Sequence, residues 1–126
     1  MATWSEMANE NALAANRLIR EQAARSGISR AYFAAYCHVT ARLHAQGVRQ
    51  FGERGNPSHT ELPSLVRSTL SGLRPMQRQV VAGAVSRLYV RRIAADYQPR
   101  FSVGPATGHE ALRDMNLVTQ ILGGNR

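Results

Sequence analysis

The segment between Pro75 and Pro99 constrains the fold of this chain more than any other. Proline is favoured in the first turn of a helix and disfavours helix in the residue before it, so these prolines bracket one helix over residues 76–96. Within it, apolar residues recur at steps of three and four, which is the spacing of one helical face: Val81, Ala84 and Leu88. The sequence therefore predicts a long helix, and Gly83 inside it indicates close helix packing.

The apolar face of this helix becomes cationic in its last turns. Continuing the same steps from Leu88 leads to Arg91, Arg92 and Ala95, so two arginines are expected to face inward. Asp96 lies four residues after Arg92, close enough to pair with it, although an acid near a helix C-terminus opposes the helix dipole. Because helix stability does not explain these charges, we interpret them as a candidate site.

Four further helices and no strand are expected elsewhere, because apolar and polar residues nowhere alternate over four or more positions. A capping box of Thr3 with Glu6 begins the first helix, and Gly27 ends it. The second helix runs from about Ser29 to Gln46. Helix breakers in residues 47–57 then predict a loop.

Two more capping boxes complete the predicted fold. Ser58 with Glu61 begins a short third helix, in which Pro63 would lie, and Thr107 with Glu110 begins the last helix. Most connections are short enough to join antiparallel neighbours. The sequence thus predicts an all-α fold, an up-and-down antiparallel bundle of four main helices plus one short helix, formed by the whole chain as a single domain.

The charge of the chain favours an acidic partner. Its formal net charge is +8, and all 16 basic residues are arginine. Nucleic acid is the commonest acidic partner of a strongly basic intracellular domain, and arginine binds phosphate through two nitrogens at once. A genome that favours arginine codons would give the same count, so both explanations stay open.

Several classes of protein are excluded by what the sequence lacks. It has no apolar stretch long enough for a membrane helix and no secretory signal, so a cytoplasmic location is expected. The single cysteine, Cys37, excludes an internal disulfide. There is no glycine-rich phosphate loop, carboxylate cluster or cysteine–histidine zinc spacing. We therefore expect no metal and no cofactor.

Two segments of the chain resemble the HEPN family, helical-bundle proteins named for nucleotide binding in higher eukaryotes and prokaryotes. Residues 29–36, Ser-Arg-Ala-Tyr-Phe-Ala-Ala-Tyr, are similar to a Ser-Arg-Ala-Tyr-Tyr-Ala-Ala-Phe run of its short bacterial and archaeal members. Residues 92–97 are similar to their Arg-x-x-Ala-Asp-Tyr segment. The resemblance covers roughly residues 11–122. It implies a homodimer whose fourth helices meet, with a basic cleft between the subunits, and RNA cleavage by toxins of toxin-antitoxin modules or by defence nucleases.

The chain departs from the pattern of the family's nucleases, in which a histidine follows the arginine after four to six residues. Asp96 and Tyr97 occupy that region here. Cleavage by attack of a 2′-hydroxyl needs a proton acceptor, a cation for the phosphorane charge and a proton donor. Arg91 and Arg92 are the candidate cations, Asp96 the acceptor and Tyr97 the donor. In the structural alternative, Arg92 and Asp96 form an ion pair that fixes the helix or the dimer interface.

A wider set of residues is expected to contact RNA: Arg30, Arg87, Arg91, Arg92 and His59. The structural alternative for Arg30 is an ion pair with Asp96 across the bundle. Other conspicuous side chains are interpreted as structural. Tyr32 and Tyr36 are expected in the core instead of stacking on bases, and Cys37 is expected to fill space there. His38 and His44 lie six residues apart, so they do not share a helical face and make no metal pair.

These observations lead to two functional hypotheses. The first is an RNA-binding protein of HEPN type, with endoribonuclease activity left undecided by the altered motif. The second is a non-catalytic regulatory or assembly subunit that pairs with a nucleotidyltransferase-type partner, for which Tyr97 would be a modification target.

Overall fold

The computed structural model describes residues 1–48 and 56–123 and contains five helices in this part of the chain. The helices are α1 (Trp4–Arg20), α2 (Ala24–Ala45), α3 (Leu62–Thr69), α4 (Pro75–Tyr97) and α5 (Pro105–Gly123). No strand occurs within the described ranges, so the predicted all-α class is confirmed. Most of the loop expected over residues 47–57 lies outside these ranges.

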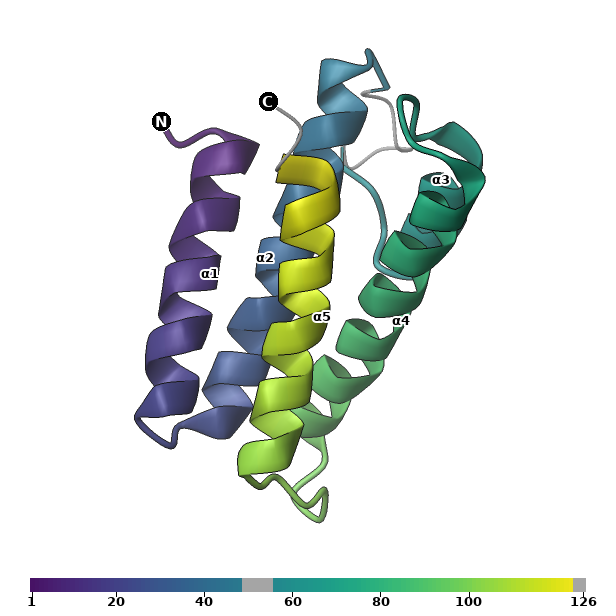
Figure 1. The fold of residues 1–126 in the computed structure, drawn as a ribbon. Coiled ribbons are helices and arrows are strands. Elements are labelled where there is room, and N and C mark those ends of the chain that lie inside the picture. The colour runs from purple at the N-terminus through teal and green to yellow at the C-terminus, as the bar shows by residue number, and fades with distance from the viewer. Residues whose placement is uncertain (49–55, 124–126) are drawn as a thin grey trace.

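The helix α2 occupies the centre of the arrangement, because it contacts α1, α3, α4 and α5. In the view of Figure 1, α1 runs downward, α2 returns upward, α4 descends and α5 rises again beside it. The short α3 packs against α4 near the upper end of that helix. The lower end of α4, which carries the candidate site residues, therefore lies between α2 and α5.

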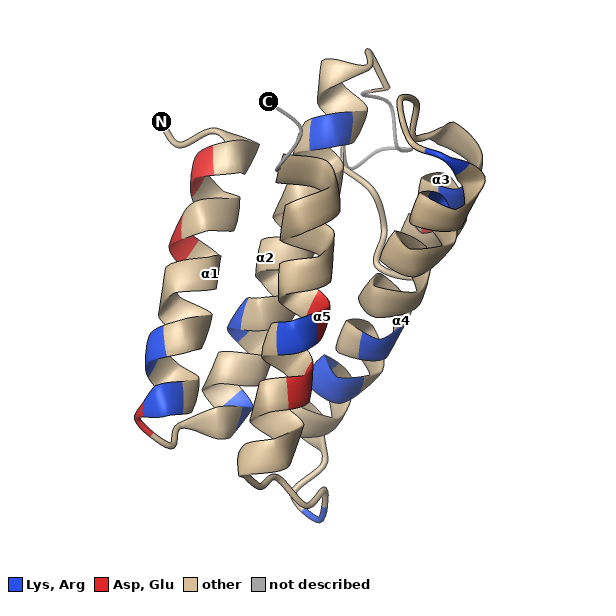
Figure 2. Ribbon diagram, in the orientation of Figure 1, with Lys and Arg blue, Asp and Glu red and all other residues tan. Residues whose placement is uncertain are grey.

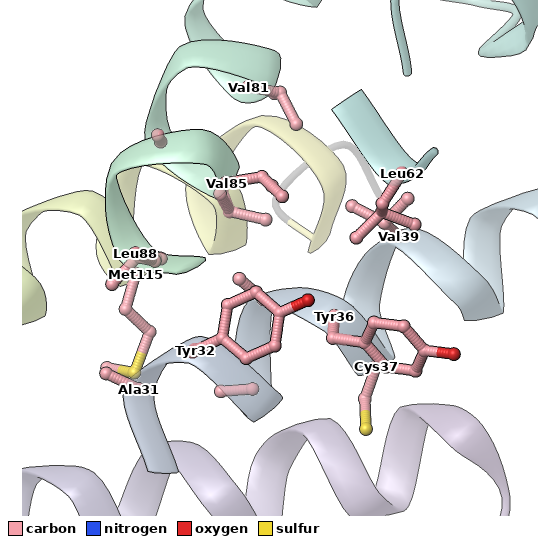
Figure 3. Close-up of a cluster of buried hydrophobic side chains, with 14 of the residues drawn as sticks. Ala31, Tyr32, Tyr36, Cys37, Val39, Leu62, Val81, Val85, Leu88 and Met115 are labelled. Carbon is pink, nitrogen blue, oxygen red and sulfur yellow. The ribbon is translucent and has the colours of Figure 1, made fainter. Parts of the chain in front are cut away.

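The core forms where α2 faces α4 and α5. Small residues alternate with tyrosines along α2, and Tyr32 is completely buried while Tyr36 is 6% exposed. Figure 3 shows these rings with the buried side chains around them, which include Leu62, Val81, Val85, Leu88 and Met115. Cys37 is also buried. The expectation that Tyr32, Tyr36 and Cys37 belong to the core is confirmed.

Helix boundaries follow the sequence where the signal is local. The capping box of Thr3 with Glu6 is present, since each side chain bonds the other residue's backbone N–H. The prediction for α4 is confirmed within one residue at each end. Ser58 and Glu61 also form the expected reciprocal bonds, but the regular helix begins only after them, with Pro63 in its first turn.

Gly27 was expected to end the first helix, and this prediction is wrong. The first helix ends at Arg20, and Gly27 lies inside α2, packed against Ile19. A Cβ at this position would lie 2.4 Å from Cγ1 of Ile19. Glycine is thus required by the close approach of α1 and α2, a cause that local sequence cannot distinguish from helix termination.

The last helix begins at Pro105 instead of at a Thr107–Glu110 capping box. Glu110 does not return to the helix N-terminus, because its carboxylate bonds Arg91 of α4. Pro105 in the first turn favours the start of the helix at this point, in place of the expected capping box.

Arg25 closes the C-terminal end of α4. That helix has no basic residue in its last turn and no glycine after it, and local backbone N–H groups bond the carbonyl groups of Ala94 and Gln98 at its end. Arg25 reaches across from α2 and donates hydrogen bonds from Nη1 to the carbonyl oxygens of Ala95 at 2.9 Å and Gln98 at 3.2 Å. Its Nη2 donates to Pro99 at 3.1 Å and to Phe101 at 2.6 Å.

Arg42 of α2 and Gln46, the residue that directly follows this helix, bond the ends of neighbouring helices in the same way. Arg42 donates from Nη1 to the carbonyl oxygen of Leu122 in α5, at 3.0 Å. Gln46 donates to the carbonyl oxygen of Thr69 at 2.7 Å and accepts from the backbone N–H of Ser71, beyond the end of α3. One central helix therefore satisfies backbone groups at the C-terminal ends of three others.

We expect the substitution Arg25→Ala to lower the free energy of unfolding by about 2–3 kcal/mol, because several carbonyl groups lose a charged donor. Arg100→Ala is the matched control, since this exposed arginine lies in the same loop and makes no hydrogen bond or ion pair with the described residues; it should change stability by less than about 0.5 kcal/mol. Urea unfolding monitored by circular dichroism measures both. Equal losses in the two variants would contradict the capping role.

Candidate functional site

The two adjacent arginines near the end of α4 face different neighbours. Successive residues of a helix point about 100° apart, so Arg91 turns toward α5 and Arg92 toward α2. Both side chains are mostly covered, with 19% and 16% of their surface exposed. They face inward as the sequence predicted, but they do not form one cationic patch.

Arg91 is held by two acids of α5. Its Nη1 lies 2.7 Å from Oδ2 of Asp114, and its Nη2 lies 2.9 Å from Oε2 of Glu110. Arg87, one turn earlier, donates from Nε and Nη2 to the same Asp114 carboxylate. The hydrogen bond with Asp114 raises the pKa of Arg87 above its ordinary value. Two cations thus meet two anions.

This network is structural in character. The side chain of Asp114 is only 7% exposed, so its charge requires buried partners. Figure 2 shows the basic and acidic positions of α4 and α5 in the lower half of the molecule, where the two helices are neighbours. Arg87 and Arg91, both expected to contact RNA, therefore join α4 to α5 within the same chain.

Asp114 was missed by sequence reasoning, although a signal for it exists. It lies on the face of α5 that carries Ala111, Met115 and Val118, all of which are buried. An acid on the apolar face of one helix is the natural partner of arginines on the apolar face of another. Pairing the acid on the apolar face of α5 with the arginines on the apolar face of α4 would have predicted the contact between these helices.

Arg92 is held mainly by aromatic rings. Its guanidinium carbon lies 5.1 Å from the ring centre of Phe33 and 5.6 Å from that of Tyr97, within the range of cation–π attraction. Nε lies 3.0 Å from Oδ2 of Asp96, although the N–H is not aligned for a hydrogen bond. Ser29 of α2 donates to the same carboxylate oxygen at 3.1 Å.

The terminal nitrogens of Arg92 differ from those of Arg91. Neither Nη1 nor Nη2 of Arg92 bonds an acceptor in the described part of the chain. Unlike Nε, these two nitrogens are not buried atoms that lack a hydrogen bond. The rings of Phe33 and Tyr97 attract the guanidinium without taking up its N–H groups. Arg92 can therefore accept a phosphate group without first losing a hydrogen bond from these nitrogens.

His59 lies in the segment before α3 and contacts aromatic side chains of α2 and α4. Its Nδ1 is 2.5 Å from the hydroxyl of Tyr32, and its ring stacks on that of Tyr89 at 5.9 Å. Its ring centre lies 6.0 Å from that of Phe33, so Phe33 contacts both His59 and Arg92. The hydroxyl of Tyr36 donates to the carbonyl of Pro57 at 2.6 Å and fixes the segment that carries His59.

Burial sets the protonation of the neighbouring groups. The desolvation of Tyr32 raises its pKa well above the ordinary value, and the nearby Tyr36 and Tyr89 raise it further. Tyr32 thus keeps its proton at neutral pH and remains available for the hydrogen bond with His59. Burial also raises the pKa of Cys37 to about 11, so this thiol is not an activated nucleophile.

A cavity of about 550 Å³ adjoins this cluster, between α1, α2 and the segment before α3. His59 and Phe33 form part of its wall, and Arg30 lies at its rim, where Nη1 donates to Oδ1 of Asn11 at 3.2 Å. Arg30 was the candidate partner of Asp96 across the bundle, and Ser29 takes that place instead.

The structure brings together five of the predicted site residues around Phe33: Arg30, His59, Arg92, Asp96 and Tyr97. It separates Arg87 and Arg91 from them. We call the first group the Phe33 cluster. Phe33 and Tyr89 themselves were missed, because an aromatic residue at helical spacing equally indicates a core position.

Neither a metal-binding cluster of side chains nor a membrane-spanning helix occurs among the described residues. No group of three or more histidine, cysteine, aspartate or glutamate side chains in them can hold a metal ion. Likewise, none of the helices within residues 1–48 and 56–123 combines the length and apolar character needed to cross a bilayer.

Comparison with models of known protein families and with curated protein sequences gives no match. The resemblance to the HEPN family therefore stays a prediction from the two quoted motifs.

We expect Asp114→Asn to lower the free energy of unfolding by about 2–3 kcal/mol, because Arg87 and Arg91 lose the buried charge that joins α4 to α5. Glu110→Gln removes a charge that also contacts Arg91 but lies on a half-exposed side chain, so its effect should stay below about 1 kcal/mol. Chemical unfolding of both variants tests this difference. A larger effect of Glu110→Gln would show that Asp114 does not carry the network.

Proposed function

We propose that this protein binds RNA through the Phe33 cluster, as an up-and-down antiparallel helical bundle of HEPN type. The observation that carries the proposal is that Phe33 contacts both His59 and Arg92, whose terminal nitrogens bond no acceptor among the described residues. Phe33 also lines a cavity with Arg30 at its rim. Binding of single-stranded RNA requires cations for phosphates and flat side chains on which bases stack. Arg92 and Arg30 supply the first, and Tyr97, which is 66% exposed, supplies the second.

The same cluster contains the groups needed for metal-independent RNA cleavage. In that reaction a 2′-oxygen attacks phosphorus, its proton passes to a base, and the bond to the 5′-oxygen breaks as that oxygen takes up a proton. We propose His59 as the group that exchanges these protons, because Tyr32 orients its ring through Nδ1. Arg92 would hold the negative charge of the phosphorane. His59 would thus replace the histidine that the α4 motif lacks.

We further propose that two copies pair through α4, as the HEPN resemblance implies. Large apolar side chains are exposed along this helix at Met76, Val80, Val90 and Tyr97. With Gly83 and Arg87, the positions from Met76 to Val90 follow at alternating steps of four and three residues, and Tyr97 lies seven residues after Val90. This is the pattern of a helix that packs against another helix. Arg87 does not oppose this pairing, because Asp114 neutralises it. Tyr97 ends the stripe, which would place the Phe33 cluster beside the interface.

We expect Arg92→Gln and Arg30→Gln each to weaken binding of a labelled single-stranded RNA by about tenfold at low salt, with a shallower salt dependence, because each removes a phosphate contact. Arg67→Gln is the control, since it removes the same charge from the surface of α3, where Arg67 bonds Gln79. Fluorescence anisotropy measures the affinities. No binding by the parent protein, or equal losses in all three variants, would contradict the proposal.

Incubation of the same labelled RNA with the protein in EDTA, followed by separation of the products, tests cleavage. We expect products ending in a 2′,3′-cyclic phosphate, which disappear in His59→Gln while RNA affinity is retained. Binding without products would reduce the proposal to a non-catalytic RNA-binding protein.

We expect Val90→Glu to convert a dimer into a monomer in sedimentation velocity, because it buries a charge at each copy of the interface. Leu13→Glu is the control, since this α1 side chain is 68% exposed and lies on another helix. A parent protein that sediments as a monomer at every concentration would contradict pairing through α4.

A further inference from the structure

A second candidate binding surface lies between α1 and α5, away from the Phe33 cluster. Both helices pack on α2 but contact each other less extensively along the seam where they meet. A cavity of about 700 Å³ occupies the lower part of this seam, between the end of α1 and the start of α5. A second cavity, of about 400 Å³, continues along the outer face of α5 and shares His109 and Leu112 with the first. We call the two together the α1–α5 groove.

The wall of the groove is apolar and its rim is cationic. Ile19, Val103 and Leu112 line the larger cavity together with Arg20, and Arg113 lines the smaller one. None of the described residues that line either cavity is acidic. The groove therefore complements a ligand that is both apolar and negatively charged.

The two rim arginines are not engaged elsewhere. Most arginines of the helix interfaces hold carbonyl groups or acids, as Arg25 and Arg91 do. Arg20 and Arg113 are exposed and form no hydrogen bond or ion pair with any residue that the structure describes. The nearby acid Glu110 is directed to Arg91 and lines neither cavity. Their charge is thus available to a partner.

The shape of the groove favours a polypeptide over a nucleic acid. Lining residues of α5 extend from Pro105 to Gln120, a length of roughly 22 Å at about 1.5 Å per residue. His109 carries the single aromatic ring among the described residues that line it, whereas surfaces that bind single strands offer several rings on which successive bases stack. Aliphatic walls instead fit the apolar face of a helix.

We propose that the α1–α5 groove binds an acidic amphipathic helix of a partner protein. Aliphatic side chains of the partner would enter the larger cavity, and its carboxylates would pair with Arg20 and Arg113. This surface would act independently of the Phe33 cluster, because the two share no residue.

Charge exchange tests the proposal on the full chain. The probe is a labelled synthetic helix with leucines on one face and glutamates on the other, and a second peptide carries lysines in place of the glutamates. We expect the double variant Arg20→Glu with Arg113→Glu to bind the glutamate peptide about tenfold more weakly than the parent does, since attraction at the rim becomes repulsion. The same variant should gain affinity for the lysine peptide.

A double variant with the same change in net charge, Arg67→Glu with Arg100→Glu, lies outside the groove and should retain binding of the glutamate peptide. Arg92→Gln should also leave peptide affinity unchanged, which separates this test from that of the Phe33 cluster. The proposal is overturned if the parent protein does not bind the glutamate peptide, or if both double variants lose affinity equally. Displacement of the peptide by single-stranded RNA from the parent protein, but not from Arg92→Gln, would also overturn it.

Discussion

The bond of Arg25 to the end of α4 is the interaction on which the candidate site depends. The last turn of α4 carries Asp96, whose negative charge opposes the helix dipole, and it contains no basic residue. Arg25 of α2 donates hydrogen bonds to several carbonyl groups at this end, and its positive charge offsets the negative charge of Asp96. Arg92, Asp96 and Tyr97 consequently have defined positions relative to α2.

The arginine content of the chain acquires a structural explanation from the same contacts. Arg25 and Arg42 close helix ends, and Arg87 and Arg91 join α4 to α5. The guanidinium group suits these tasks because it is planar, stays charged and donates several hydrogen bonds in fixed directions. A net charge of +8 therefore overstates the cationic surface that a partner meets. An acidic partner meets only the smaller set of guanidinium groups that bond neither an acid nor a carbonyl group of this chain.

The sequence predicted the features that depend on neighbours along the chain. The capping box of Thr3 with Glu6 and the bounds of α4 follow from rules over a few residues, and both are confirmed. Gly27 shows the limit of such rules, since a glycine required by Ile19 of another helix has the same local signature as one that ends a helix. Contacts between helices depend on the angle at which the helices cross, which the spacing of residues along one helix does not determine.

The candidate site shows the same limit in its charges. Helical spacing placed Arg91 and Arg92 on an inward stripe, but it could not tell that the two point to different helices. The difference decides their chemistry. Arg91 uses its terminal nitrogens on acids of α5, whereas Arg92 lies near two aromatic rings and its terminal nitrogens bond no acceptor among the described residues. An arginine held by aromatic rings is fixed in place and is still able to bind an anion. Arg92, and not Arg91, is therefore the candidate ligand for a phosphate group.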